Sequence, residues 1–251
     1  FDLSQKITDT VLTAEGTQKI GTVHSPISLA FRGENLLVAD SGINAVQEFA
    51  PAGDGNWRYT GFAITGSGRG ENRISGAADA AYAGGTVYIL DGNGEILAVG
   101  AGGAQTDYRR IAPGEKLTFS PVKIETDGKT ILLADAVQAA FYNPETGELT
   151  PAAAVRSPLY DIAYANGMYY ILSGDRVIAY DAETLSPVSL ITSLAVGENS
   201  LIAADVDRNL YLYDSGTETV VRYGEDGSPT ARSYQLPEAA ISIGADLNGN
   251  L

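Results

Sequence analysis

The sequence predicts an all-β fold built from repeated antiparallel strands. A ten-residue phrase, apolar at its centre and usually ending in Asp, recurs five times in the 251 residues, and a truncated sixth copy begins at Asp246. Each copy contains a turn pair such as Asn166-Gly167, which tolerates the positive φ angles of a two-residue hairpin. No stretch shows useful helical periodicity. The five full copies are residues 31–40, 82–91, 126–135, 164–173 and 205–214.

Each unit is expected to contain four strands. The first precedes the turn pair, and the second follows it as a continuous apolar run such as residues 36–40, typical of strands covered on both faces. After a short polar loop comes a third strand, and a polar fourth strand returns toward the next unit. First strands are predicted at residues 27–31, 77–81, 122–125, 160–163, 201–204 and 241–245, and third strands at 45–49, 95–99, 139–142, 176–180 and 219–223. Four antiparallel strands in a unit of about 40 residues form a blade of a β-propeller.

The residue that ends each second strand sets the number of blades. These residues are Asp40, Asp91, Asp135, Ser173 and Asp214, and the spacing between them is 38 to 51 residues. Phe1-Asp2 looks like the end of one more second strand, whereas the chain stops inside the truncated copy. We therefore predict a single domain of six blades, the last of which is shared by the two termini. The expected blades are residues 27–64, 76–112, 121–155, 159–196, 200–235, and 237–251 together with 1–23.

Composition restricts the classes of function. Asp and Glu number 31 against 16 Lys and Arg, and the net charge of −15 would repel a nucleic-acid backbone. No apolar run approaches the roughly 20 residues that span a bilayer, so we expect no membrane insertion by this segment. The absence of cysteine excludes disulfides, thiolate zinc sites and cysteine nucleophiles. This acidic, Lys-poor composition without cysteine favours an extracellular or cell-surface location.

Three motifs resemble the NHL-type repeats of six-bladed β-propellers. They are residues 36–42 (LLVADSG), residues 131–135 (ILLAD) and the glycine-rich linker at residues 66–73 (GSGRGENR). The resemblance extends over the whole chain, although Ser173 replaces the usual Asp in the fourth unit. It implies a six-bladed ring whose termini share one blade.

The recurring Asp residues are better explained by structure than by chemistry. An Asp at the same place in each blade, followed by Gly or Ser, can accept backbone N–H bonds in its own turn. A catalytic site instead combines different residues from different blades. We therefore expect these residues to hold loops rather than to form a carboxylate ring around a metal. They are Asp40, Asp91, Asp135, Asp214 and Asp2.

The single histidine, His24, limits the enzymes that this chain resembles. A site with two imidazoles is excluded, and a Ser-His-Asp triad would have to use His24 itself. NHL-like lyases rely on several histidines around a divalent metal, which this chain cannot supply. The gluconolactonase and regucalcin family also resembles this architecture, and it binds a divalent cation in the channel through Glu, Asn and Asp. The alternative function is therefore a divalent-metal-dependent hydrolase of that type, with Ca²⁺ or another divalent cation held by Glu125, Asp161 and Asp205.

Binding residues are expected where the repeats differ from one another and in the long loops. Cations and aromatic residues gather around residues 51–76 of an otherwise acidic chain, and Trp, Tyr and Arg are common interface anchors. We expect a non-catalytic binding or interaction module without a cofactor, which takes a protein or carbohydrate ligand on its loop face. It would be a monomeric domain of a larger extracellular or cell-surface protein, and a structural spacer is a third possibility. The candidate binding residues are His24, Trp57, Arg69, Arg73, Tyr160 and Ser173.

Overall fold

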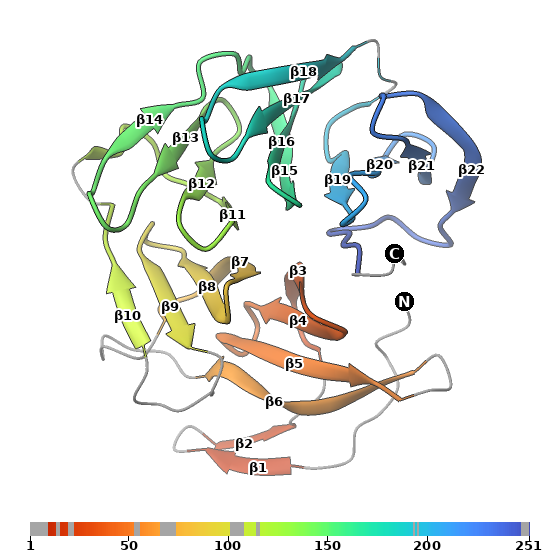
Figure 1. The fold of residues 1–251 in the computed structure, drawn as a ribbon. Helices are drawn as coiled ribbons and strands as arrows, with labels where there is room; N and C mark the ends of the chain where they lie inside the picture. Colours follow the sequence, from red (N-terminus) through yellow and green to blue (C-terminus); the bar gives the residue numbers. More distant parts are fainter. Residues whose placement is uncertain are drawn as a thin grey trace.

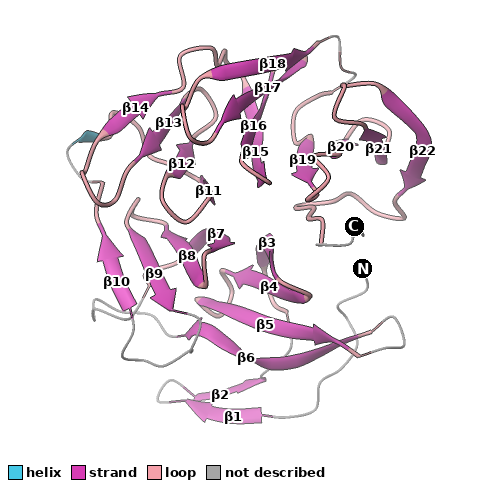
Figure 2. Cartoon of the chain, in the orientation of Figure 1, coloured by secondary structure: helices cyan, strands magenta, loops and turns pink. Residues whose placement is uncertain are grey.

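The computed structural model describes residues 10–13, 16–19, 23–52, 56–65, 74–100, 108–113, 116–192, 194, 196–246 and 251. Within these residues, five four-stranded antiparallel sheets follow one another around a ring (Figure 1). The first strand of each sheet lies nearest the centre, and the chain then steps outward strand by strand. Figure 2 shows that the described part of the ring consists almost entirely of strands and loops. The fold is a β-propeller, as the repeats predicted.

The strand boundaries follow the predicted repeats closely. The first two blades are β3 (Pro26–Arg32), β4 (Asn35–Asp40), β5 (Ala45–Pro51) and β6 (Trp57–Thr65), then β7 (Ala77–Ala83), β8 (Thr86–Asp91), β9 (Ile96–Gly100) and β10 (Tyr108–Ile111). The third is β11 (Lys123–Thr126), β12 (Ile131–Ala134), β13 (Ala139–Tyr142) and β14 (Leu149–Pro151). The last two are β15 (Leu159–Ala165), β16 (Met168–Ser173), β17 (Arg176–Asp181) and β18 (Pro187–Ile191), then β19 (Leu201–Ala204), β20 (Leu210–Asp214), β21 (Thr219–Tyr223) and β22 (Pro229–Gln235).

The hairpins between first and second strands form for the predicted reason. At the turn that joins β15 to β16, Asn166 and Gly167 both have positive φ, 43° and 79°. A two-residue turn of this kind matches the twist of the strands that it joins, and Asn and Gly adopt it at low cost. The turn pair therefore sets the register in which Ala165 pairs with Met168.

The hydrophobic core lies between neighbouring blades. One cluster joins second and third strands of the third blade to inner strands of the fourth, and Phe141 packs against Tyr169 and Tyr180 at centroid distances of 5.4 and 5.3 Å. The second strand of each blade is covered on both faces, as in β16, where all six residues are buried. Covering both faces explains why the second strands are continuous apolar runs instead of alternating ones.

The segment of residues 236–246 lies between the fifth blade and the first. Ala240, Ile243 and Ala245 pack against the core of the fifth blade, and the Leu29 amide of β3 donates to Ser242 Oγ at 3.1 Å. In Figure 1 this segment runs from β22 back toward the centre of the ring. Its residues take the place of the predicted first strand at 241–245, but the described part of the segment is irregular rather than a strand.

The predicted sixth blade stays a prediction. The described N-terminal strands, β1 (Thr10–Thr13) and β2 (Gly16–Lys19), pair with each other in a separate two-stranded sheet. Residues 1–9, 14–15, 20–22 and 247–250, including Asp2, lie outside the described part of the chain. Nothing in the described residues forms a helix that is both long and apolar enough to cross a membrane.

The predicted structural role is confirmed, with one addition, for the four recurring Asp residues that the structure describes. Asp135 and Asp214 accept amide hydrogen bonds within their own turns, from Val137 and Gln138 and from Gly216 respectively. Asp40 does so through Gly42, and it also accepts the amides of His24 and Ser25 at 2.7 and 2.9 Å. Asp91 likewise accepts the amides of Ser75 and Gly76. In the first two blades, therefore, the Asp ties the end of the second strand to the loop that leads into the first.

Candidate functional site

A belt of equivalent residues connects the inner strands around the ring. It contains one residue from each first strand and one from the segment of residues 236–246. At four of these six positions, a side-chain oxygen accepts a hydrogen bond from a backbone amide of the next unit. The donating residue directly follows the belt position of that unit. Asp79 Oδ2 accepts from Ile124 at 2.8 Å, and Asp161 Oδ2 accepts from Ile202 at 3.0 Å. The hydroxyls of Ser28 and Ser242 accept from Ala80 and Leu29 in the same way. The belt positions are Ser28, Asp79, Lys123, Asp161, Leu201 and Ser242.

Lys123 is the cation of the belt. It cannot accept a hydrogen bond, and its Nζ instead contacts Asp161 Oδ1 at 2.9 Å. Asp161 is 6% exposed, so its charge is held by Lys123 and by the Ile202 amide together. The interaction with Asp161 raises the pKa of Lys123, against the opposing effect of burial. The belt therefore combines hydrogen bonds and one ion pair between neighbouring blades.

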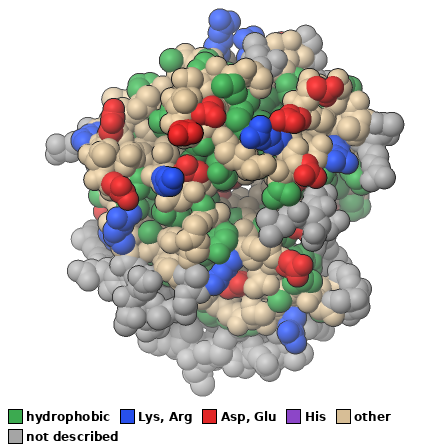
Figure 3. Space-filling view, viewed as in Figure 1, with side chains coloured by type: hydrophobic (Ala, Val, Ile, Leu, Met, Phe, Trp, Pro, Cys, Tyr) green, Lys and Arg blue, Asp and Glu red, His purple; other side chains and the backbone are tan. Residues whose placement is uncertain are grey.

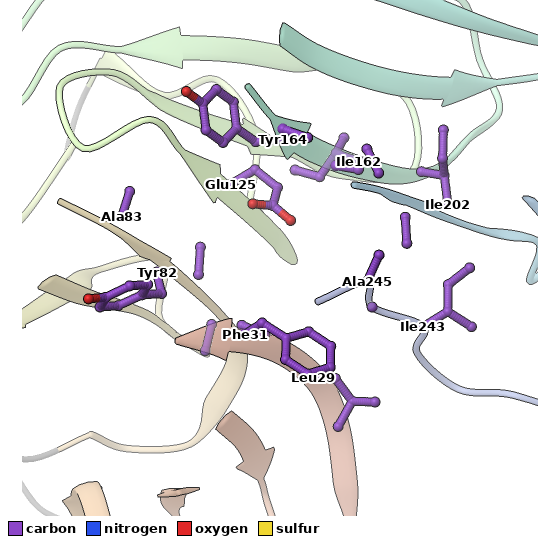
Figure 4. A pocket seen from close by; sticks show the side chains of 18 of the residues that line it. Leu29, Phe31, Tyr82, Ala83, Glu125, Ile162, Tyr164, Ile202, Ile243 and Ala245 are labelled. Atoms are coloured by element: carbon purple, nitrogen blue, oxygen red, sulfur yellow. The ribbon is translucent and has the colours of Figure 1, made fainter. Parts of the chain in front are cut away.

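A cavity of about 540 Å³ lies inside the belt. Its wall includes the positions two residues beyond the belt, where the side chains are small in five of six units: Ala30, Ala81, Ala163, Ala203 and Gly244. In the third unit this position is Glu125, the one long side chain of the layer. Figure 4 shows the Glu125 carboxylate pointing into the open centre of the cavity and the Phe31 ring on its wall, beside β3. Small residues thus create the space, and Glu125 projects into it.

The cavity is acidic. Among the described residues of the lining, Lys123 is the one lysine or arginine, whereas six residues carry carboxylates: Asp79, Glu125, Asp127, Asp161, Asp205 and Asp246. Acidic side chains lie on several sides of the central hollow in Figure 3. Burial raises the pKa of Glu125 well above its ordinary value, and the negative charges of Asp79 and Asp161 raise it further. Burial also raises the pKa of Asp79, although Lys123 and hydrogen bonds oppose this shift.

Replacing Glu125 with glutamine is expected to stabilise the protein above neutral pH by about 1–3 kcal/mol, since a poorly solvated charge is removed. Because the pKa of Glu125 is higher in the folded state, the folded protein holds this proton more tightly, and stability falls as pH rises through the folded pKa. Gln cannot ionise, so the gain should be small near pH 4.5 and larger at pH 8. Urea denaturation at both pH values measures it. As a control, Glu145→Gln in an exposed turn should leave the free energy of unfolding unchanged at both pH values. Equal stability of Glu125→Gln and the wild type at pH 8 would contradict the prediction.

The predicted metal ligands do not assemble into a metal centre in the described structure. Glu125, Asp161 and Asp205 all line the cavity. However, Asp205 is engaged by the side chains of Asn209 and Tyr211 at 2.8 to 3.0 Å, and Asp161 by Lys123. Among the described residues, no three His, Asp or Glu side chains are grouped closely enough to hold a metal ion.

The predicted binding residues are dispersed. His24 is exposed in the loop before β3, and Ser173 is fully buried, with its hydroxyl bonded to the backbone of Arg156. Trp57 begins β6 and packs against Phe31 at a centroid distance of 6.3 Å. Arg69 and Arg73 lie outside the described residues. Ser173 thus does the structural work of the Asp that it replaces, and it is not available to a ligand.

Tyr160 belongs to an apolar rim around one mouth of the ring, on the face where loops lead into the inner strands. We call this the loop face. Each residue of the rim directly precedes a belt position in the sequence. In three blades the rim residue is the extra residue of a β-bulge. Val122 and Ile241 of the rim are 52% and 57% exposed, and Val137, in the loop after β12, is 53% exposed. The apolar members of the rim are Ile27, Ala78, Val122, Tyr160 and Ile241.

Sequence reasoning named the acidic residues of the inner strands but missed the belt and the rim. A signal for the belt was present, because Ser28, Asp79 and Asp161 each stand three residues before an aromatic residue of the first strand. That spacing repeats at Phe31, Tyr82 and Tyr164. The small residues between them also mark the layer that surrounds the cavity.

Blades of four antiparallel strands around a central cavity place this chain in the class of β-propeller proteins. A chain in the crystal structure of the nidogen/laminin complex is similar to it, with a TM-score of 0.65 and 12% identity over 90% of this chain and 89% of that one. The WD40 β-propeller domain of Doa1 has a TM-score of 0.61 and 12% identity, over 90% and 87% of the two chains. PorZ, a surface component of the type-IX secretion system of Porphyromonas gingivalis, has a TM-score of 0.53 and 11% identity; the match covers 96% of this chain and 36% of PorZ.

These likenesses concern the fold. No family model matches the sequence, and no curated protein matches it either. At identities near 12%, a shared β-propeller fold is compatible with many functions. The function therefore has to be argued from the surface and the cavity of this chain.

Proposed function

We propose that this chain is a non-catalytic binding module that holds a protein partner on its loop face. The observation that carries the proposal is the apolar rim. Val122, Val137 and Ile241 are each more than half exposed on this face, although large apolar side chains are usually covered in a folded protein. Apolar groups on a rigid scaffold are suited to becoming the buried centre of an interface.

The geometry of the rim supports recognition rather than catalysis. Its residues belong to β-bulges or to loop ends, where a bulge redirects a side chain away from the regular pleat. In the first two blades, Asp40 and Asp91 accept backbone amide hydrogen bonds that fix the loops behind the rim. A surface that is fixed before binding loses little conformational entropy when a partner covers it.

The similar structures support a protein partner. The nidogen chain was solved in complex with laminin, and PorZ is described as a bacterial surface component. By analogy with these proteins, we infer that this chain acts in an extracellular or cell-surface protein. From its sequence motifs we infer an NHL-like propeller with six units around its ring. The hydrogen bond from Leu29 to Ser242 supports the count, because the segment of residues 236–246 occupies the sixth belt position.

The test uses a pair of matched variants. In the first, Val122→Glu and Ile241→Glu place charges on the rim; in the second, Val188→Glu changes a comparably exposed valine on β18, the outermost strand of the fourth blade. Partners captured by the wild type from surface and secreted proteins of the source organism are identified, purified and measured by surface plasmon resonance. The rim variant should bind at least about 10-fold more weakly, as expected for residues at the centre of an interface, and Val188→Glu should bind like the wild type.

Two results would overturn the proposal. One is a purified partner that binds the rim variant and the wild type equally well. The other is saturable hydrolysis of a lactone by the purified chain in the presence of Ca²⁺, Mn²⁺ or Zn²⁺, because that activity belongs to the alternative hydrolase.

A further inference from the structure

We propose that the central cavity is a second binding site, and that it takes an organic cation: a ligand with one or two primary ammonium groups on an alkyl chain. The site is separate from the apolar rim. Its lining extends from the belt to the hairpin turns at Gly33, Gly84 and Asn166, at the ends of the inner strands that lie away from the loop face. Neither His24 nor Tyr160 is part of this lining.

The space is suited to a small organic molecule. A volume of about 540 Å³ falls within the usual range for ligand pockets in proteins. It exists because five units place Ala or Gly in the layer above the belt. Larger side chains there would fill the centre of the ring, as they do in a packed core. The third unit breaks the series with Glu125, whose carboxylate points into the space (Figure 4).

The charge of the cavity selects a cation. Lys123 lies within ion-pair distance of Asp161, and no ion pair closer than 4 Å involves Glu125 or Asp79 among the described residues. An anionic ligand would meet six carboxylate residues and one lysine. A bound ammonium group near Glu125 would offset the repulsion that Asp79 and Asp161 exert on this carboxylate.

The arrangement of the carboxylates favours an organic cation over a metal ion. Ca²⁺ requires six to eight oxygen ligands at about 2.3–2.6 Å. The described acidic residues are not gathered closely enough for a metal site. Carboxylates spread around a wide cavity instead suit an elongated molecule whose charges are several bonds apart.

The apolar part of the lining accounts for the alkyl chain. Phe31, Tyr82 and Tyr164 line the cavity three residues beyond the belt, and Ile162 and Ile202 line it one residue beyond the belt. Aromatic rings attract ammonium groups through their faces, and aliphatic side chains cover methylene groups without losing a hydrogen bond. Arg32 already lies over the Tyr82 ring at 5.9 Å, so a cation at this edge of the cavity has a precedent within the chain.

The experiment is a calorimetric titration with 1,5-diaminopentane at low ionic strength and pH 8. The wild type should bind one equivalent saturably, and 1,5-pentanediol, which has the same chain without charge, should not bind. Glu125→Gln should weaken diamine binding at least 10-fold. Glu145→Gln removes the same charge from an exposed turn outside the cavity lining, and it should bind like the wild type.

The matched glutamine variants separate the cavity from the general attraction of an acidic protein for diamines. Because Glu125→Gln is expected to be at least as stable as the wild type, circular dichroism and the denaturation midpoint can show that weakened binding does not come from unfolding. Absence of saturable diamine binding by the wild type would overturn the inference. So would equal loss of affinity in the two glutamine variants, since binding would then follow net charge alone. Neither result bears on the loop-face partner.

Discussion

Replacing Asp161 with alanine is expected to lower the free energy of unfolding by about 3–5 kcal/mol, the usual cost of removing one partner from a buried ion pair. Asp161 is 6% exposed, and its two oxygens accept from Lys123 Nζ at 2.9 Å and from the Ile202 amide at 3.0 Å. Alanine would leave a partly buried ammonium group and a buried amide without these acceptors. Urea denaturation, followed by circular dichroism and by the fluorescence of the single tryptophan, Trp57, measures the loss.

Two further variants divide this loss between the ion pair and the hydrogen bond. Asp161→Asn keeps an oxygen for the Ile202 amide but removes the charge, so it should cost less than Asp161→Ala. Lys123→Met in the Asp161→Ala background removes the unpaired charge and should recover part of the stability. A cost below about 1 kcal/mol for Asp161→Ala, or no recovery with Lys123→Met, would show that the belt does not hold the fourth blade against its neighbours.

Replacing Asp40 with alanine is expected to lower the free energy of unfolding by about 2–4 kcal/mol, because it removes three amide hydrogen bonds to a buried carboxylate and a hydrogen bond to a charged group contributes about 1.5–3 kcal/mol. The total is below the sum of three such bonds because His24, Ser25 and Gly42 are exposed, so that water can partly replace the lost acceptor. Asp40 is fully buried and accepts the amides of His24, Ser25 and Gly42 at 2.7 to 3.0 Å. The variant should also loosen the loop that contains His24. Hydrogen exchange of the His24 and Ser25 amides would report this local effect, and urea denaturation the global one.

Asp135 provides the matched control for Asp40. It stands at the equivalent place in the third blade, but within the described part of the chain its carboxylate accepts hydrogen bonds only from Val137 and Gln138 of its own turn. Asp135 and Val137 are both at least partly exposed, so water can replace the lost acceptor. Asp135→Ala should therefore cost less than about 1 kcal/mol. If Asp40→Ala and Asp135→Ala lower the free energy of unfolding equally, the hydrogen bonds that Asp40 accepts from His24 and Ser25 contribute nothing to stability.

The fold of the described blades could be predicted because its signals are local. The alternation of turn pairs with apolar runs needs only short-range information, and the predicted strand at residues 201–204 coincides with β19. Residues 241–245, predicted to form an inner strand, lie against the fifth blade and β3 but are irregular in the described structure. Their conformation depends on contacts with the fifth blade and with Leu29, which the local sequence does not encode.

The candidate site could be predicted in part. Glu125, Asp161 and Asp205 are acidic and belong to or adjoin predicted inner strands, and the structure places all three around one cavity. Their separate roles were not visible in the sequence. Only the folded ring shows that Lys123 and Ile202 engage Asp161, that Asn209 and Tyr211 engage Asp205, and that Glu125 projects into the open space.

The sequence by itself determined that this protein is a repeating all-β structure, because hairpin turns and strand burial depend on residue type and on spacing over a few positions. The tertiary structure decided which contacts the equivalent residues of different repeats make. Ser173 is buried, and its hydroxyl is bonded to the backbone of Arg156, 17 positions away. Whether a carboxylate meets a hydrogen-bond donor or a cavity depends on residues that the ring brings together from about 40 positions away, as Ile202 is brought to Asp161. Burial, charge pairing and the volume of the cavity depend on how the blades pack around the ring. These properties distinguish Glu125 from the carboxylates that hold the blades together.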